Sequence, residues 1–268
     1  MQVVTTGVVF RPQSPPERLR EVVEATEAAG VAELWLWEDC FLQGGLTAVT
    51  AALAWSQRLR VGIGLLPVAL RNPALAAMEI ATVARLFPDR FLPGLGHGVL
   101  DWMGQVGARA GSPLTLLREY TAAVRDLLHG DRVDVDGRYV HLDGVALDWP
   151  PASPPPLLLG ARGPKTLRLA GELADGVILD AAATPDDLRA ARVEIDAGRG
   201  VAGRTDPYQV VVYLEPPAGL PADELTEVVR RSVHDLGEAG ATSVVFHGSA
   251  DAPDPGPLIR ALTAVRGA

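Results

Sequence analysis

Two glycine-containing segments could bring the backbone close to a ligand. Residues 94–98 place three glycines at alternate positions, which lets a chain approach a flat or anionic group. Residues 160–163 separate an apolar run from a helical segment, so backbone N–H groups and the helix dipole favour an anion there. Arg162 and Lys165, the only lysine, add positive charge. We expect a phosphate-type group at residues 160–163, whereas residues 94–98 fit a tight turn equally well.

Asp39 and Cys40 form the second chemical feature, directly after the apolar run around Leu34. A carboxyl group can relay a proton. A lone thiol is most often a small buried apolar group, and a nucleophilic cysteine needs a base whose proximity the sequence does not show. From the residues alone, Cys40 is best explained as an inert small side chain. The chain has no motif of the H-E-x-x-H or G-x-S-x-G type, so we expect neither a metal site nor a serine hydrolase.

Strand and helix signals alternate along the whole chain. Helix signals include Gly30 after an apolar-periodic segment, Asn72 followed by Pro73, and the Thr184–Asp187 capping pattern. The expected strands are 3–10, 34–38, 60–66, 90–96, 157–160, 175–180, 208–214 and 242–247.

Eight strand–helix units in 268 residues predict a (β/α)8 TIM barrel, as one domain over residues 1–268. An open doubly wound sheet is the alternative, but its G-x-G-x-x-G turn is missing after the first strand. Residues 131–156 interrupt the alternation, and Asp136-Gly137 is a hairpin turn signal. We expect a hairpin insertion between the fourth helix and the fifth barrel strand. In such a barrel the active site lies at the carboxyl ends of the strands.

Composition narrows the classes of partner. The 24 basic and 33 acidic residues give a net charge of −9, which argues against nucleic-acid binding. One cysteine excludes an intrachain disulfide and a multi-cysteine zinc site. Residues 1–10 lack signal-peptide features, and no run reaches the roughly 20 apolar residues that span a bilayer. We expect a cytoplasmic homodimer that acts on a small molecule, without membrane or nucleic-acid partners.

Three stretches resemble the bacterial luciferase-like superfamily. They are residues 28–39, which include Leu-Trp-Leu-Trp-Glu-Asp, residues 60–98, and residues 157–179. The resemblance implies a (β/α)8 barrel that binds FMN or the deazaflavin coenzyme F420 at its carboxyl rim. Residues 94–108 are more similar to deazaflavin members, in which a non-prolyl cis peptide backs the ring; Gly64-Leu65 matches that position.

The resemblance implies an F420-dependent oxidoreductase that transfers a hydride to or from a small organic substrate. Arg162 and Gly163 would hold the cofactor phosphate, and Gly64 and Leu65 would press on one face of the ring. The candidate catalytic residues Asp39 and Cys40 would line the substrate side, where Asp39 could relay a proton. The full set of expected cofactor contacts is Gly64, Leu65, Gly96, His97, Gly98, Ala161, Arg162, Gly163, Gly176 and Val177.

Two positions depart from the deazaflavin sugar dehydrogenases. Those enzymes have a catalytic histidine directly after the Asp39 position and an acid after the strand-four glycines; this chain has Cys40 and Val99. Sugar-phosphate oxidation by that mechanism is therefore not expected. Two alternatives stay open: an FMN-dependent monooxygenase that uses O2 and a partner reductase, and a flavin-binding barrel without activity.

Overall fold

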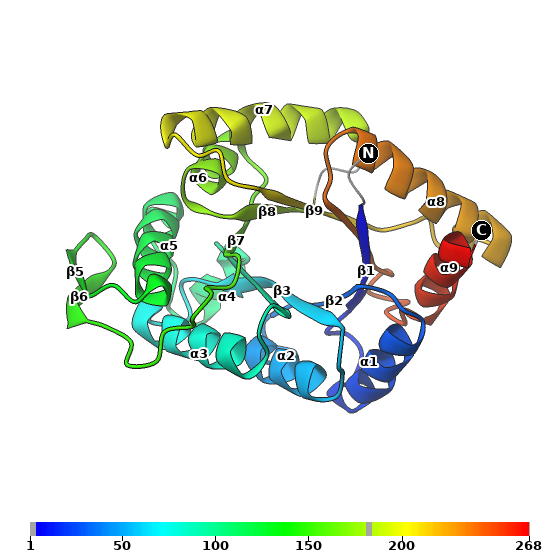
Figure 1. Ribbon diagram of the computed structural model, residues 1–268, viewed down its shortest axis with the longest axis horizontal. Coiled ribbons are helices and arrows are strands. Elements are labelled where there is room, and N and C mark those ends of the chain that lie inside the picture. Colours follow the sequence, from blue (N-terminus) through cyan, green and yellow to red (C-terminus); the bar gives the residue numbers. More distant parts are fainter. Residues whose placement is uncertain (1–3, 181–183, 268) are drawn as a thin grey trace.

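The barrel is closed by parallel pairing around the whole ring, in the order β1-β10-β9-β8-β7-β4-β3-β2. The computed structural model describes residues 4–180 and 184–267; Val3, where the first strand was expected to begin, lies outside them. The (β/α)8 barrel that the sequence predicts is confirmed (Figure 1). Its strands are β1 (Thr5–Phe10), β2 (Glu33–Leu36), β3 (Arg60–Pro67), β4 (Phe91–Gly96), β7 (Leu158–Gly160), β8 (Gly176–Leu179), β9 (Gln209–Leu214) and β10 (Ser243–Phe246).

Helices surround the barrel because each buries an apolar stripe against the outer face of the sheet (Figure 1). Asn72 caps α3, accepting a 2.9 Å hydrogen bond from the N–H of Ala74, and Thr184 forms a capping box with Asp187. The helices are η1 (Pro16–Arg18), α1 (Leu19–Ala28), α2 (Gly45–Ala54), α3 (Pro73–Leu86), α4 (Leu100–Gln105), α5 (Pro113–His129), α6 (Pro164–Leu173), α7 (Pro185–Val201), α8 (Ala222–Glu238) and α9 (Gly256–Gly267). Among the described residues, no helix combines the length and apolar character needed to cross a bilayer.

Two segments near the rim differ from expectation. Strand β2 ends at Leu36 rather than at Glu38, so residues 37–44 form a longer loop than predicted. The short helix α4, between β4 and α5, is an element beyond the eight expected strand–helix units, and it buries Met103.

The hairpin insertion is confirmed, and it projects beyond α5 at the left of Figure 1. It consists of antiparallel β5 (Val133–Asp136) and β6 (His141–Val145). The Glu119 carboxylate on α5 accepts hydrogen bonds of 3.0, 2.8 and 3.2 Å from the backbone N–H groups of residues 138, 139 and 140. These bonds fix the turn to α5.

The barrel interior is a second apolar core, separate from the one under the helices. Because side chains alternate along a strand, every second residue faces inward. At the amino-terminal end, buried Glu33 accepts hydrogen bonds from Trp35 Nε1 at 2.9 Å and Ser243 Oγ at 2.8 Å. The apolar inward residues above it are Val9, Trp35, Leu92, Leu158, Ile178, Val211, Tyr213 and Val245.

Candidate active site at the carboxyl rim

Inward positions at the carboxyl ends of the strands form the rim of the barrel mouth, and the rim has two unlike parts. On the neighbouring strands β3, β4 and β7 the position is a glycine, namely Gly64, Gly96 and Gly160; we call this the glycine arc. On β8, β9, β10, β1 and β2 it is a large polar or aromatic residue, and we call this the polar arc. Its members are Asp180, Glu215, His247, Arg11 and Trp37.

The glycine arc is shaped by Leu65 and Tyr213. A Cβ added to either Gly96 or Gly160 would lie 2.3 Å from Leu65 Cδ2, so both glycines make room for the leucine. A Cβ on Gly64 would lie 2.0 Å from the hydroxyl oxygen of Tyr213, which reaches across from the opposite strand β9. The Gly64–Leu65 peptide is cis, as expected, and the pairing of β3 with β4 shifts register there.

The start of α6 adjoins this arc and fits an anion. Gly163 is its N-cap and supplies no side-chain cap, and the space where its Cβ would stand is open for 4 Å. Arg162, 74% exposed, is already paired: it donates to both carboxylate oxygens of Asp180, at 2.8 Å from Nε and 2.5 Å from Nη2. A phosphate at this helix end would therefore compete with Asp180 for the guanidinium.

The remaining expected cofactor residues are only partly brought together. His97 lies next to α6, with Nε2 3.3 Å from Thr166 Oγ1, and burial lowers its pKa. Gly98 has a φ of +68° and packs against Pro67. Ala161 is buried at the end of β7.

Gly176 and Val177 are not brought to the rim. Gly176 begins β8, at the amino-terminal end of the barrel, and a Cβ there would lie 2.4 Å from Leu158 Cδ2. Val177 is fully buried in the core beneath the helices. A residue at the start of a parallel strand lies at the end of the barrel opposite its mouth. In this structure, Gly176 and Val177 therefore contribute to packing.

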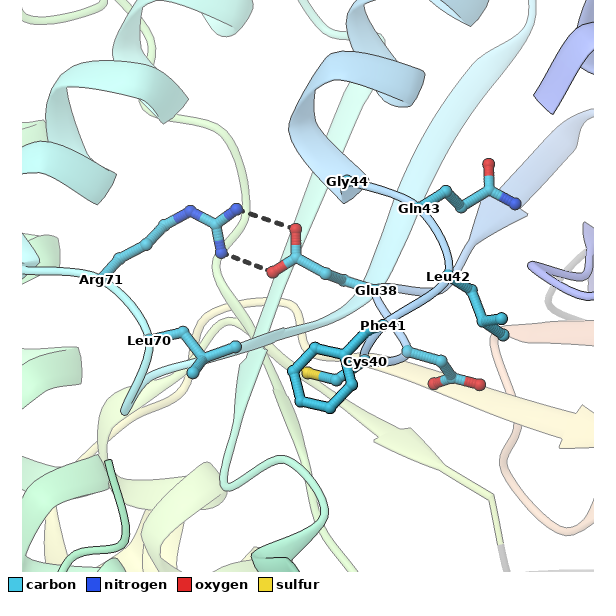
Figure 2. Close-up of a pocket in the computed structure, with 9 residues that line it drawn as sticks. Glu38, Cys40, Phe41, Leu42, Gln43, Gly44, Leu70 and Arg71 are labelled. Carbon is cyan, nitrogen blue, oxygen red and sulfur yellow. Dashed lines mark hydrogen bonds and ion pairs between the residues drawn. The ribbon is translucent and has the colours of Figure 1, made fainter. Parts of the chain in front are cut away.

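A pocket of about 430 Å³ opens beside β2 and β3. Figure 2 shows Glu38 between Arg71 and the start of α2, and Phe41 and Cys40 on the side of Leu70. The Glu38 carboxylate accepts from Arg71 Nη1 at 2.5 Å, from Nη2 at 2.8 Å and from the N–H of Gly45 at 2.8 Å. The pair thus ties the loop after β2 to the loop after β3. Sequence reasoning missed Arg71, because no local motif marks a partner 33 residues away.

Asp39 and Cys40 both line this pocket, as the sequence-based interpretation requires. Burial raises the pKa of Asp39, while the nearby Arg11 guanidinium opposes the shift. Burial also raises the pKa of the Cys40 thiol, and the carboxylates of Glu38 and Asp39 raise it further. Cys40 is therefore a protonated thiol at neutral pH, which makes it a poor nucleophile and a poor base.

The family of this chain is shown by a sequence match that covers nearly its whole length. Residues 3–259 match the model of the luciferase-like monooxygenase family. The chain belongs to that family. Among curated family relatives, a 5,10-methylenetetrahydromethanopterin reductase of Methanolobus tindarius is 31% identical over 209 residues, covering 78% of this chain and 63% of the relative. An F420-dependent glucose-6-phosphate dehydrogenase of Mycobacterium avium is 32% identical over 180 residues, covering 62% of this chain and 54% of the relative.

The matched region thus spans less than two thirds of the length of these relatives. Solved structures agree on the fold over the whole chain. The coenzyme F420 dependent tetrahydromethanopterin reductase of Methanopyrus kandleri has a TM-score of 0.81 at 21% identity and 97% coverage of both chains. An F420-dependent secondary alcohol dehydrogenase with an F420–acetone adduct has a TM-score of 0.83 at 20% identity and 98% coverage of both.

Proposed function

We propose that this protein is an oxidoreductase that uses coenzyme F420 to exchange a hydride with a small organic substrate. The observation that carries the proposal is the glycine arc beside the uncapped start of α6. Three neighbouring strands have glycine at the rim, so backbone and Leu65 form the wall there without charged side chains, which suits a flat ring. The helix end next to them suits a phosphate. Curated relatives with F420 in their names support the choice of cofactor.

The residues present fit such a cofactor. Gly64 and Leu65 would support one face of the ring, with Gly96 and His97 along its border. Arg162, Gly163 and the α6 dipole would hold the phosphate, and Gly98 and Ala161 would shape the wall between them. When bound, the deazaflavin supplies hydride chemistry, whereas the protein orients it and excludes water.

Asp39 would hold the proton that is exchanged with the substrate. A buried carboxyl group with a raised pKa exchanges protons more readily near neutral pH than an ordinary aspartate does. Cys40, as a neutral thiol beside it, would shape the pocket without taking part in the chemistry. Its small side chain leaves space in the 430 Å³ pocket for a substrate group.

A fluorescence titration with F420 and, separately, with FMN tests the proposal. We expect saturable F420 binding, and FMN binding that is weaker by about tenfold or more, equivalent to about 1.4 kcal/mol. Tighter binding of FMN would favour the monooxygenase alternative. Binding without any turnover of candidate substrates would favour the barrel that lacks activity. The homodimer and the cytoplasmic location stay predictions from the sequence.

A further inference from the structure

The pocket beside β2 and β3 presents apolar side chains to the solvent. Phe41 is 65% exposed and Leu42 53% exposed, and both belong to the loop after β2. Leu70, from the loop after β3, lines the same pocket and is partly exposed. Figure 2 shows Phe41 on the side of the pocket where Leu70 lies. Exposed apolar side chains that gather around a pocket indicate a binding surface, whereas single ones scattered over a protein need no explanation.

Arg71, the cation in the lining of this pocket, is already held by two carboxylates. Its Nη1 and Nη2 donate to Glu38 at 2.5 and 2.8 Å, and its Nε lies 3.4 Å from Glu79 Oε2. Each guanidinium nitrogen therefore faces a carboxylate oxygen. Asp39 adds a further carboxyl group to the lining. An anion that enters the pocket must compete with these acids for a single positive charge.

Arg11, whose charge acts on Asp39, is also committed to other groups. Its Nη1 donates to the carbonyl oxygen of Gly248 at 2.7 Å, and its Nε donates to Gln13 Oε1 at 3.0 Å. The Glu215 carboxylate lies 3.8 Å from Nη1, and the Arg11 side chain is only 11% exposed. Neither guanidinium near the pocket is thus available to pair with a substrate anion, and like charges brought together at close range repel each other.

The size of the pocket suits a small organic molecule. Its volume of about 430 Å³ lies within the range of pockets that hold such ligands. A molecule inside it would contact the apolar side chains of Phe41, Leu42 and Leu70 and the carboxyl group of Asp39. The pocket therefore combines an apolar surface and a hydrogen-bonding group with charges that oppose an anion.

We propose that this pocket selects an uncharged substrate with an apolar body and rejects phosphates and carboxylates. Phe41 and Leu42 are the residues that select the apolar body, and Asp39 offers a hydrogen bond to a polar group of the substrate. The carboxylates that hold Arg71 exclude anions. The inference rests on the proposed function in calling the occupant a substrate, whereas the selection itself is a property of the pocket that needs no cofactor.

A matched pair of fluorescent probes tests the selection. N-phenyl-1-naphthylamine is uncharged, and 8-anilinonaphthalene-1-sulfonate is the same ring system with one sulfonate group. We expect the unmodified protein to bind the uncharged probe at least about tenfold more tightly than the sulfonate. Equal affinities, or tighter binding of the sulfonate, would contradict the proposal.

Substitution of Phe41 tests whether the uncharged probe lies in this pocket. Phe41→Ser should weaken its binding by about tenfold, because apolar area is lost from the contact. Val193→Ser, which changes an exposed apolar residue on α7, is the control and should leave the affinity unchanged. An equal affinity in Phe41→Ser and in the unmodified protein would overturn the role of this residue and, with it, the proposal.

Freeing Arg71 from its carboxylates should weaken the discrimination against anions. Glu38→Gln keeps an acceptor for the N–H of Gly45 but removes the negative charge, so affinity for the sulfonate probe should rise by about fivefold or more. Affinity for the uncharged probe should not change. Glu79→Gln, which leaves the Glu38–Arg71 pair intact, should act in the same direction by a smaller factor, and circular dichroism checks the folding of both variants. If both fold and neither binds the sulfonate more tightly, the proposal is wrong.

The same titrations with and without saturating F420 separate this inference from the proposed function. We expect the preference for the uncharged probe to persist when F420 is bound, because the cofactor lies on the glycine arc and leaves the pocket open. Failure to bind F420 overturns the proposed function, and the ratio of the two probe affinities still decides whether the pocket excludes anions. F420 binding together with equal affinities for the two probes overturns the inference alone.

Discussion

The glycine arc and the polar arc share one barrel rim but present opposite surfaces. On β3, β4 and β7 the inward rim positions are glycines, so the wall is formed by backbone together with Leu65 and the Tyr213 hydroxyl. On β9, β10, β1 and β2 the equivalent positions carry Glu215, His247, Arg11 and Trp37, which contact one another. The first surface suits a flat ligand, whereas the charged and aromatic side chains of the second suit polar groups.

The glycines at the rim can be explained by packing within the protein as well as by contact with a ligand. Gly96 and Gly160 make room for Leu65, and Gly64 makes room for the hydroxyl group of Tyr213. These contacts come from strand β3 and from the opposite side of the barrel. The absence of side chains is therefore required by packing within the protein as well as by any ligand.

The largest effect is expected where the glycine arc is filled. Gly64→Val would place atoms within 2.0 Å of the Tyr213 hydroxyl position, so β3 or Tyr213 must move. We expect a loss of about 1–3 kcal/mol in the free energy of unfolding and a loss of F420 affinity of about 100-fold or more. Chemical denaturation and fluorescence titration measure the two quantities. Gly200→Ala, at an open helical position, is the control; an equal loss there would contradict the argument.

The next largest effect is expected from breaking the Glu38–Arg71 ion pair. This pair joins the loops after β2 and β3, where the polar arc meets the glycine arc. Glu38 is 8% exposed and Arg71 21%, so Arg71→Met leaves a largely buried carboxylate without its partner. We expect a loss of about 2–3 kcal/mol in the free energy of unfolding, below the 3–5 kcal/mol of a fully buried pair. The exposed pair Arg230–Glu227 offers the control, since Arg230→Met should cost at most about 1 kcal/mol. Equal effects in denaturation curves would show that Glu38 finds another partner.

Arg162 and Asp180 should give opposite effects on cofactor affinity. Arg162→Ala should weaken F420 binding by about tenfold, because a charged hydrogen bond to phosphate is lost from an exposed site. Asp180→Asn should strengthen it by roughly threefold, since the competing carboxylate is removed. Both changes should shrink in high salt. Arg189→Ala, which breaks another exposed arginine–aspartate pair, is the control. Unchanged affinity in Arg162→Ala would remove this residue from the site.

The smallest effect is expected at Cys40. Its thiol is protonated at neutral pH, so Cys40→Ser keeps a neutral group of similar size. Single-turnover rates and F420 affinity should stay within about threefold of the unmodified protein, while Cys40→His should crowd the pocket. A loss of about a thousand-fold in Cys40→Ser, with cofactor affinity intact, would place the thiol in the chemistry.

The sequence predicted the barrel well because its signals are local. The caps at Asn72 and Thr184 and the hairpin turn after Asp136 depend on neighbours a few residues away. The site was harder to predict, because its decisive contacts join distant segments. His247 and Glu215 belong to different strands, and Arg162 meets Asp180 only in the folded barrel. Strand parity could have identified the polar arc, had the ends of the strands been known to within one residue.

A crystal structure of the protein with bound F420 tests the central claim most directly. We expect the deazaflavin ring against Gly64–Leu65 on the glycine arc, its phosphate at the start of α6, and open space on the side of Asp39 for a substrate. Arg162 should donate its hydrogen bonds to the phosphate instead of to Asp180. A ring bound over the polar arc, or a phosphate distant from Gly163, would contradict this division of the rim.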